Sequence, residues 1–434
     1  MSRTGFFAFS AWFLLQPFTV LTAAYLGILA LDKMLAPILI VIWVATAILG
    51  QQRTDAKRVS FILIALAFFL VRNLSKIDNA SFYPFILWED IILFGYFCIP
   101  ILYVNNIERI TTASKLIAIN AVVACSSAFL VAMGWLTLPY ERSSEGRFDL
   151  AIQKSIGLYS SYGDVAQISA YFLLLALFVP TSLTLRRHAK GGLAVGLLAF
   201  AVVIIGLIGN QSRSMLLSLI VAVAIAWIFY YRSKPNTNKL LYNTLLFAMG
   251  AIAISFVAVV INQIISLLGA LGGADASGTA AGRLIQYQYA LELISQNPIL
   301  GVDGSYYERF IAQVNGIHNM WLGQMARGGI ITTLLLLWLL LKLFRISLRV
   351  LNEPETRLFG TVAIGYLFAV LVSTLFYPAN SQFFWALLGM NVAIVTTLDM
   401  QRLGKHETAP ALDNSDTTRI PSKNRILAYR GTRR

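Results

Sequence analysis

The chain has 434 residues, of which 58% are hydrophobic and 12% are charged, and its mean hydropathy is +0.71. A soluble domain of this size carries about a quarter of its residues as charged side chains, so most of this surface does not face water. Apolar runs close to the length that crosses a bilayer recur along the chain. Apolar and polar residues do not alternate along these runs as they do in the strands of a membrane β-barrel. The composition therefore excludes a water-soluble enzyme and predicts an all-α, polytopic membrane protein.

We expect about twelve transmembrane helices, forming one domain over residues 1–400. The expected spans are 6–30, 35–50, 59–72, 84–104, 115–138, 161–184, 192–209, 213–231, 240–268, 320–344, 358–377 and 382–398. The first apolar run is longer than the core of a signal peptide, and we interpret it as a retained helix. Residues 401–434 are polar and basic, and we expect a disordered cytoplasmic tail.

The formal net charge is +14, but the charges lie in short blocks between apolar runs. Such a pattern indicates membrane orientation rather than nucleic-acid binding. Lysine and arginine gather in alternate connections, including the tail. Because positive residues stay on the cytoplasmic side, both termini are predicted to be cytoplasmic. Two long extracytoplasmic loops then fall near 139–160 and 269–319, the second of them before the tenth helix.

The cysteines do not suggest a cofactor site. Cys98 and Cys125 both lie inside apolar runs, which favours packed thiols. The chain lacks Cys/His spacing typical of a metal site, and its outer loops lack paired acids. We therefore expect neither a metal nor a cofactor.

The larger loop begins with a run of small residues and continues as RLIQYQYALELISQNP. Four apolar side chains recur at helical spacing and share one face: Leu284, Tyr287, Leu291 and Ile294. The pattern predicts a short helix that lies on the membrane or caps the bundle and that ends at Pro298.

Three polar residues stand where outward-facing elements begin. Arg213 opens the eighth helix in GNQSRSM, Arg283 opens the loop helix in SGTAAGRL, and His318 precedes the tenth helix in GIHNMW. Each also has a plainer interpretation: an interfacial anchor for Arg213, a solvated loop charge for Arg283, and a packed or exposed imidazole for His318. It is their combination on one side that indicates a site.

The combination suits a diphosphate at the lipid boundary. Arginine presents a planar set of donors that matches phosphate oxygens. The start of a helix adds N–H groups and the positive end of its dipole. A histidine with an ordinary pKa near 6.5 accepts a proton from a hydroxyl at neutral pH.

The order of SR in GNQSRSM, GR in AAGRLIQYQYALELISQNPILGV and HN in GIHNMWLGQMARGGI resembles the O-antigen ligase/polymerase superfamily, over about Gly209 to Ile331. The resemblance implies a metal-independent, inverting glycosyltransferase at the periplasmic face of a bacterial inner membrane, with a glycan on undecaprenyl pyrophosphate as donor. It implies that Arg213 and Arg283 hold the pyrophosphate and that His318 activates the acceptor hydroxyl.

Other residues carry weaker predictions. Asn319 could orient His318. Glu89 and Asp90 lie about two turns inside the fourth helix, where embedded acids often serve function, or pair with an arginine and hold the bundle. Arg309 and Arg327 flank the histidine segment and could bind the acceptor glycan, although a solvated surface position is the favoured interpretation for each.

We expect a polymerase that extends lipid-linked repeat units of a surface polysaccharide, exopolysaccharide or O-antigen. A ligase that moves the finished glycan to lipid A-core shares the donor and the chemistry. A polysaccharide lipid transporter and a structural membrane scaffold are the alternatives from other classes. Expected partners are the lipid-linked glycan, the glycan or lipid A-core acceptor, membrane lipids and other polysaccharide-assembly proteins, but not nucleic acid.

Overall fold

The structure is a computed structural model that describes most of the chain as separate ranges. These are residues 3–18, 31–48, 55–74, 83–136, 162–180, 191–210, 213–233, 279–302, 317, 319–375 and 381–408. Two compact units are distinguished, Met1–Asp399 and Met400–Arg434, and the first contains every candidate site residue.

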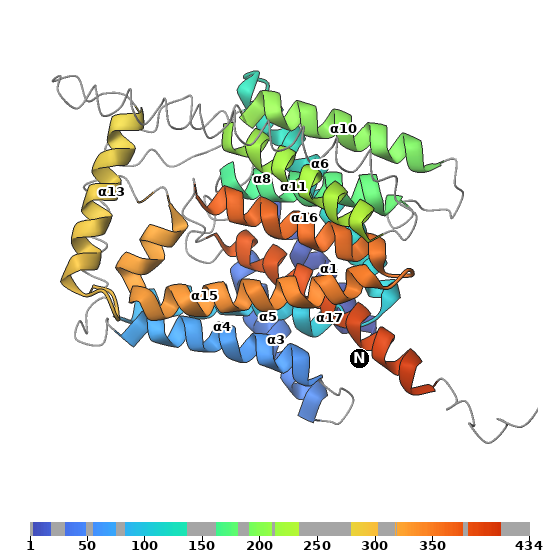
Figure 1. Cartoon of the computed structure of the whole chain (residues 1–434), viewed down its shortest axis with the longest axis horizontal. Coiled ribbons are helices and arrows are strands. Elements are labelled where there is room, and N and C mark those ends of the chain that lie inside the picture. Colours follow the sequence, from blue (N-terminus) through green and yellow to red (C-terminus); the bar gives the residue numbers. More distant parts are fainter. Residues whose placement is uncertain are drawn as a thin grey trace, which may run out of the picture. The chain divides into compact units, whose positions relative to one another are not determined.

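The described ranges contain helices and no strand, which confirms the predicted all-α class (Figure 1). The α-helices are α1 (Arg3–Leu15), α3 (Leu31–Ile48), α4 (Ala56–Leu74), α5 (Tyr83–Tyr103), α6 (Ile107–Ala132), α8 (Tyr162–Phe178), α10 (Gly191–Asn210), α11 (Arg213–Arg232), α13 (Thr279–Gln296), α15 (Met320–Asn352), α16 (Arg357–Thr374) and α17 (Gln382–Thr408). A short 3-10 helix, η1 (Gln16–Phe18), follows α1.

Four helices in the described ranges are long and apolar enough to cross a membrane. They are Ile107–Ala132, Met320–Asn352, Arg357–Thr374 and the Gln382–Leu403 part of α17. The chain is thus a membrane protein. The total of twelve spans stays a prediction, and the expected ninth helix at 240–268 and the loop near 139–160 lie outside the described residues.

Several helix ends differ from the predicted ones. The first predicted span, 6–30, is wrong as one continuous helix, because α1 ends at Leu15 and a 3-10 turn follows. Proline at position 17 has no backbone N–H to continue an α-helix. Helix α6 starts eight residues before the predicted 115, because the side chain of Asn106 accepts from the backbone N–H of Arg109 and caps it. Helix α17 continues to Thr408, into the stretch expected to be disordered.

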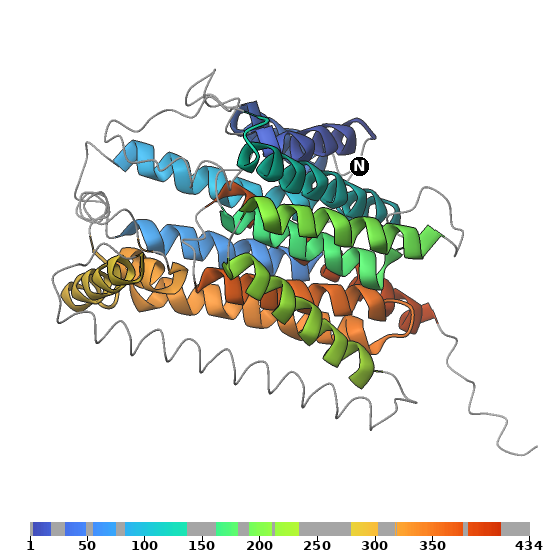
Figure 2. The same ribbon diagram turned by 90° about the horizontal axis from the view of Figure 1, so that it is seen from above.

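The long helices run side by side (Figure 2). Helix α16 packs against α8, α11 and α15, while α4 packs against α5 and α15. Aromatic rings fill the space between them: Trp385 contacts Phe69 and Phe97 at centroid distances of 5.0 and 6.0 Å. Tyr171 and Tyr366 stack at 4.3 Å. These buried rings fix the mutual positions of α4, α5, α8, α16 and α17.

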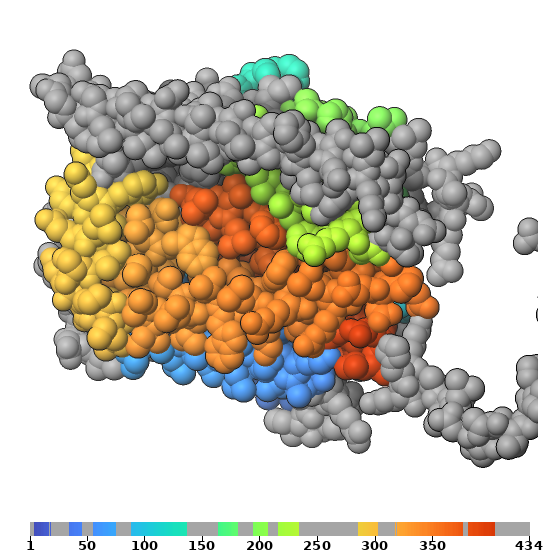
Figure 3. All heavy atoms as spheres, viewed as in Figure 1, coloured from blue at the N-terminus to red at the C-terminus, as the bar shows by residue number. Residues whose placement is uncertain are grey.

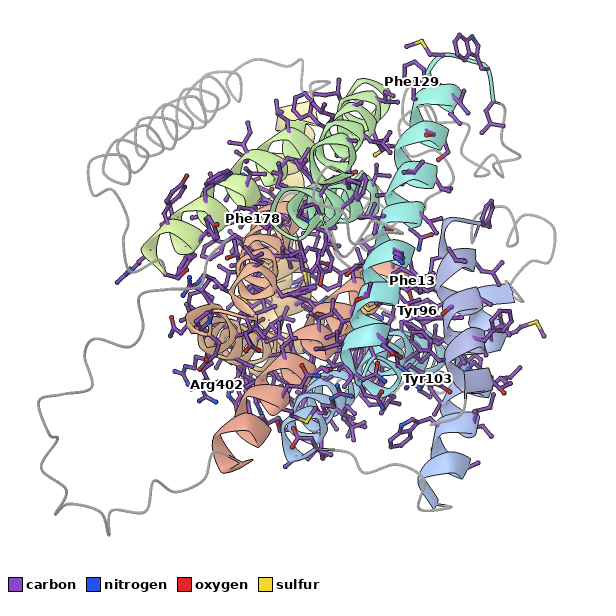
Figure 4. The ribbon with its side chains drawn as sticks, turned by 90° about the vertical axis from the view of Figure 1, so that its right-hand side faces the viewer. Phe13, Tyr96, Tyr103, Phe129, Phe178 and Arg402 are labelled. Carbon is purple, nitrogen blue, oxygen red and sulfur yellow. The ribbon has the colours of Figure 1, made fainter. Side chains whose placement is uncertain are left out.

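A second aromatic group ties the beginning of the chain to the bundle. Trp12 meets Tyr96 edge-on at 5.0 Å, and Phe9 stacks on Tyr103 at 5.7 Å. Figure 4 shows Tyr96 and Tyr103 near Phe13 of α1. All five side chains are fully buried. Helix α1 is therefore part of the core despite its short length.

Side-chain contacts define two ends of the bundle. At one end Lys57 pairs with Asp399 at 2.5 Å. Beside it, Arg58 donates to the carbonyl oxygens of Ile101 and Val104, both at 2.9 Å. The start of α4 therefore lies with the last residues of α5 and with Asp399. We call this the Asp399 end.

The opposite end gathers the starts of α8, α15 and α17 and the end of α16. Three side-chain hydrogen bonds join them: Gln167 to Ser373 at 3.1 Å, Trp321 to Thr374 at 3.2 Å, and Ser381 to Asp164. Because α15 begins there, directly after Asn319, we call this the Asn319 end.

Candidate functional site

Helix α11 begins at Arg213, as the sequence predicted. Its far end contacts the end of α8, where Phe178 meets Trp227 and Tyr230 at centroid distances of 5.5 and 5.6 Å. The two helices thus run in the same direction. Since α8 starts at the Asn319 end, α11 and the backbone of Arg213 start there too. The Arg213 side chain lies outside the described residues.

The predicted loop helix exists as α13, but it starts at Thr279. Arg283 is therefore its fifth residue and does not open it, and the Arg283 side chain lies outside the described residues. The helix stands across the direction of α15 (Figure 1) and lies against it on the molecular surface (Figure 3). It thus packs on the bundle.

The predicted apolar face of α13 is only partly correct. Ile294 packs against buried residues, whereas Leu291 is 57% exposed, and the Leu284 side chain lies outside the described residues. Ala290 and Leu293, which were not predicted, are fully buried. The buried pair packs with Ala326 of α15 and with Ile317, just before the helix. Contact with α15 therefore covers a face that contains Ala290 and Leu293, which the helical spacing of the larger apolar residues did not indicate.

Helix α15 is broken near its start, a feature that the sequence analysis missed. Gly329 has φ +69° and ψ −172°, outside the helical region. The backbone N–H of Ile330 donates to the carbonyl of Pro298 at 2.8 Å, and Val302 N–H donates to Ala326 O at 2.9 Å. The turn after α13 thus supplies the hydrogen bonds that the broken helix lacks.

Only glycine fits at the break. A Cβ at Gly329 would lie 2.0 Å from the carbonyl oxygen of Ile299, and the positive φ is strained for any other residue. The hydroxyl groups of Thr332 and Thr333 donate to Gly329 O at 3.0 and 3.1 Å. The Gly-Gly pair in MARGGI was the sequence signal for this break.

Asn319 caps α15. Its side-chain oxygen accepts from the backbone N–H of Leu322 at 3.1 Å, and its carbonyl accepts from Gly323 N–H at 2.9 Å. His318 lies outside the described residues, but it directly precedes this cap. The structure thus gives Asn319 a capping function that the sequence analysis did not predict.

A buried ionic cluster lies close by. Asp90 Oδ1 is 3.5 Å from the guanidinium of Arg72 and 3.9 Å from that of Arg327. Asp90 Oδ2 accepts from Asn73 Nδ2 at 2.8 Å. The relative exposures of the Arg72, Asp90 and Arg327 side chains are 0%, 1% and 3%. We call these four residues the Asp90 cluster.

The cluster shows the arginine pairing expected in one interpretation of Asp90, and it corrects the interpretation of Arg327. Asp90 pairs with arginines, as its structural interpretation required; a function beyond that stays a prediction. Arg327 was expected on the solvated surface, and that expectation is wrong, because its side chain is buried and faces Asp90 of α5. Arg72 was not predicted at all. Glu89, next to Asp90, is half-buried, and Arg309 lies outside the described residues.

The Asn319 end therefore contains the start of α11 and the capped, broken start of α15, with α13 packed against α15. Helix starts offer N–H groups and positive dipole ends that favour anions. Within the described ranges no group of three or more His, Cys, Asp or Glu residues is placed to hold a metal. Helix starts arranged in this way can bind an anionic group.

Comparison with known families gives one match. Residues 198–337 match the family described as O-antigen ligase. The matched region contains α11, α13 and the break in α15, and it includes positions 213, 283, 318 and 319. It also contains the whole stretch on which the sequence resemblance rested, and so supports that resemblance. A search among curated proteins gave no match.

Proposed function

With an O-antigen ligase domain at residues 198–337 as the premise, we propose that this membrane protein is an inverting, metal-independent glycosyltransferase. It takes a glycan from undecaprenyl pyrophosphate at the extracytoplasmic side of the bacterial inner membrane. It joins repeat units of a surface polysaccharide, exopolysaccharide or O-antigen into a polymer. The observation that carries the proposal is the family match, which spans all three predicted site residues.

The proposed reaction is one displacement. The acceptor hydroxyl oxygen attacks the anomeric carbon of the donor sugar while the bond from that carbon to the diphosphate oxygen breaks. Undecaprenyl pyrophosphate leaves with the electron pair, and the hydroxyl proton passes to His318. Attack opposite the leaving group inverts the configuration at the anomeric carbon.

The proposed roles of the arginines follow from the charge that develops. Negative charge grows on the diphosphate as the bond breaks, and donors already in place stabilise it. Arg213 at the first position of α11 combines its guanidinium with the N–H groups of that helix start. Arg283 would approach from α13, which packs on the start of α15. Two guanidinium groups would supply the field that a divalent cation supplies elsewhere.

Polymerase and ligase differ in acceptor, and a genetic test separates them. Deletion of a polymerase leaves single repeat units on the final acceptor, whereas deletion of a ligase leaves long polymer on the carrier lipid. We expect the first pattern, with rescue by the wild-type gene and none by His318→Ala at equal protein level. Polymer stranded on the carrier would instead identify a ligase that acts on lipid A-core.

One observation favours a second candidate, a transporter of lipid-linked glycan. Transporters often contain broken helices and charged groups inside the helix bundle, and both are present here in Gly329 and the Asp90 cluster. Proteoliposomes loaded with a fluorescent lipid-linked sugar distinguish the two. Movement between leaflets without a new glycosidic bond would support the transporter and reject the transferase.

A further inference from the structure

The first nine residues of α15, Met320–Gly328, form a short helical segment between the Asn319 cap and the break at Gly329. We call this the α15 lead segment. It directly follows His318 and Asn319 in the chain. Whatever fixes this segment also fixes where the chain emerges at position 318.

The lead segment is held at several points along its length. Trp321 donates to Thr374 of α16 at 3.2 Å near its beginning. Ala326 accepts from Val302 N–H at 2.9 Å near its end. On the side facing α4 and α5, Arg327 reaches Asp90, which also faces Arg72. The break at Gly329 separates this segment from the long remainder of α15, so these contacts rather than helix continuity determine its position.

The contact between Arg327 and Asp90 has unusual electrostatics. Two guanidinium groups face the same carboxylate oxygen, so the three charged groups sum to one positive charge in a buried site. Like charges repel strongly where the effective dielectric constant is low. The Asp90 carboxylate faces both Arg72 of α4 and Arg327 of the lead segment, and its negative charge lowers the cost of placing them close together.

We propose that Asp90 is a positioning residue for the reaction, and this rests on the proposed function. By holding Arg72 and Arg327 together, it fixes the α15 lead segment and with it the position of His318. Arg327 lies eight residues after Asn319, about 12 Å along a helix, so in this proposal Asp90 acts on the site through the lead segment. Small displacements of a catalytic group reduce the rate strongly, by about 100-fold for an ångström.

The test compares two buried aspartates at opposite ends of the same bundle. Asp90 and Asp399 are each 1% exposed and each pair with basic side chains. In purified protein reconstituted with the lipid-linked glycan, Asp90→Asn should lower kcat about 10- to 100-fold while the donor KM changes less than about 3-fold. Asp90→Glu, which keeps the charge, should recover part of kcat. Asp399→Asn should leave kcat within about 3-fold. Equal effects of the two Asn variants, or an unchanged kcat in Asp90→Asn, would overturn the proposal.

A measurement made without substrate tests the positioning role of Asp90 independently of the proposed glycosyltransferase function. Amide hydrogen exchange of peptides covering 319–328 should accelerate at least 10-fold in Asp90→Asn and stay unchanged in Asp399→Asn. Asp90→Asn combined with Arg327→Met should restore part of the protection, because it removes the facing charge. Faster exchange in a protein whose wild type forms no glycosidic bond would keep the positioning role and reject the transferase. Unchanged exchange in Asp90→Asn would reject the positioning role whatever the activity.

Discussion

The two ends of the bundle both bury an aspartate against basic side chains, but they are built differently. At the Asp399 end, Lys57 takes the carboxylate, while Arg58 donates to carbonyls at the end of α5. At the Asn319 end, two arginines share one oxygen of Asp90. At the first end Lys57 and Arg58 contact different acceptors, whereas at the second end two arginines lie near one oxygen of the same acid.

The backbone also differs between the two ends of the bundle. Helices α4 and α5 reach the Asp399 end as continuous helices, whereas α15 is broken at the Asn319 end and a turn docks into the break. Inside a membrane, broken helices and shared buried charges are costly and are found mainly where function requires them. The comparison therefore favours the Asn319 end as the place of the proposed chemistry, and the region that matches the O-antigen ligase family includes the start of α15 at that end.

The largest expected effect comes from the proposed acid–base group. His318→Ala should lower the rate of glycan transfer by about 100- to 10,000-fold, the range for losing a positioned base. The measurement is the single-turnover rate with protein amount and melting temperature matched to wild type. A membrane scaffold would show unchanged glycan in cells carrying this variant, and that result would remove the distinction between the two ends.

Helix α11 has an arginine at each end, so the two ends of the bundle can be compared within one helix. Arg213→Ala should cost about 100- to 1,000-fold in kcat if the guanidinium stabilises the leaving diphosphate. Arg213→Lys should recover only part, because lysine lacks the planar set of donors. Arg232→Lys, at the other end of the same helix, is the matched control and should be neutral. Arg283→Lys should resemble Arg213→Lys; wild-type turnover in either would contradict the assigned role.

The break in α15 predicts a stability effect with its own control. Gly329→Ala combines a strained φ with a Cβ 2.0 Å from a carbonyl oxygen, whereas Gly134→Ala has a similar φ of +74° and nothing within 4 Å. Strain alone costs about 1 kcal/mol, and the overlap should add roughly 2 kcal/mol. Thermal unfolding in detergent should therefore show a larger loss for Gly329→Ala. Equal losses would mean that the turn after α13 does not hold the break.

The smallest predicted effect concerns the cap of α15. Asn319→Ala should cost about 1 kcal/mol of unfolding free energy, and Asn319→Ser should restore it, because a serine hydroxyl also accepts from the N–H groups of a helix start. Activity then distinguishes two roles. If Asn319 acts through the cap, serine restores glycan transfer as well. If the amide N–H groups orient His318, serine restores stability and leaves activity low.

Much of this end of the molecule was predictable from local sequence. The start of α11 at Arg213 followed from a polar segment before an apolar run, and the existence of α13 followed from helical spacing. The exposure of Leu291 could not be predicted, because the packing against α15 decides which face of α13 is covered. The break at Gly329 had a local signal, but the turn that stabilises it comes from outside the helix.

The Asp90 cluster lay beyond the reach of local patterns. Its charged members lie on α4, α5 and α15, which are far apart in the chain. A lone arginine near the end of an apolar helix looks like a surface charge until the helix packed against it is known. Arg72 was therefore missed, and Arg327 was predicted to be exposed. Charged residues inside apolar spans should be examined as sets.

The most direct measurement uses purified protein in proteoliposomes with a defined undecaprenyl-pyrophosphate repeat unit, with excess chelator and with or without lipid A-core. The account predicts release of undecaprenyl pyrophosphate together with a new, inverted glycosidic bond, in wild type and not in His318→Ala. Recovery of intact lipid-linked donor under both conditions would contradict it.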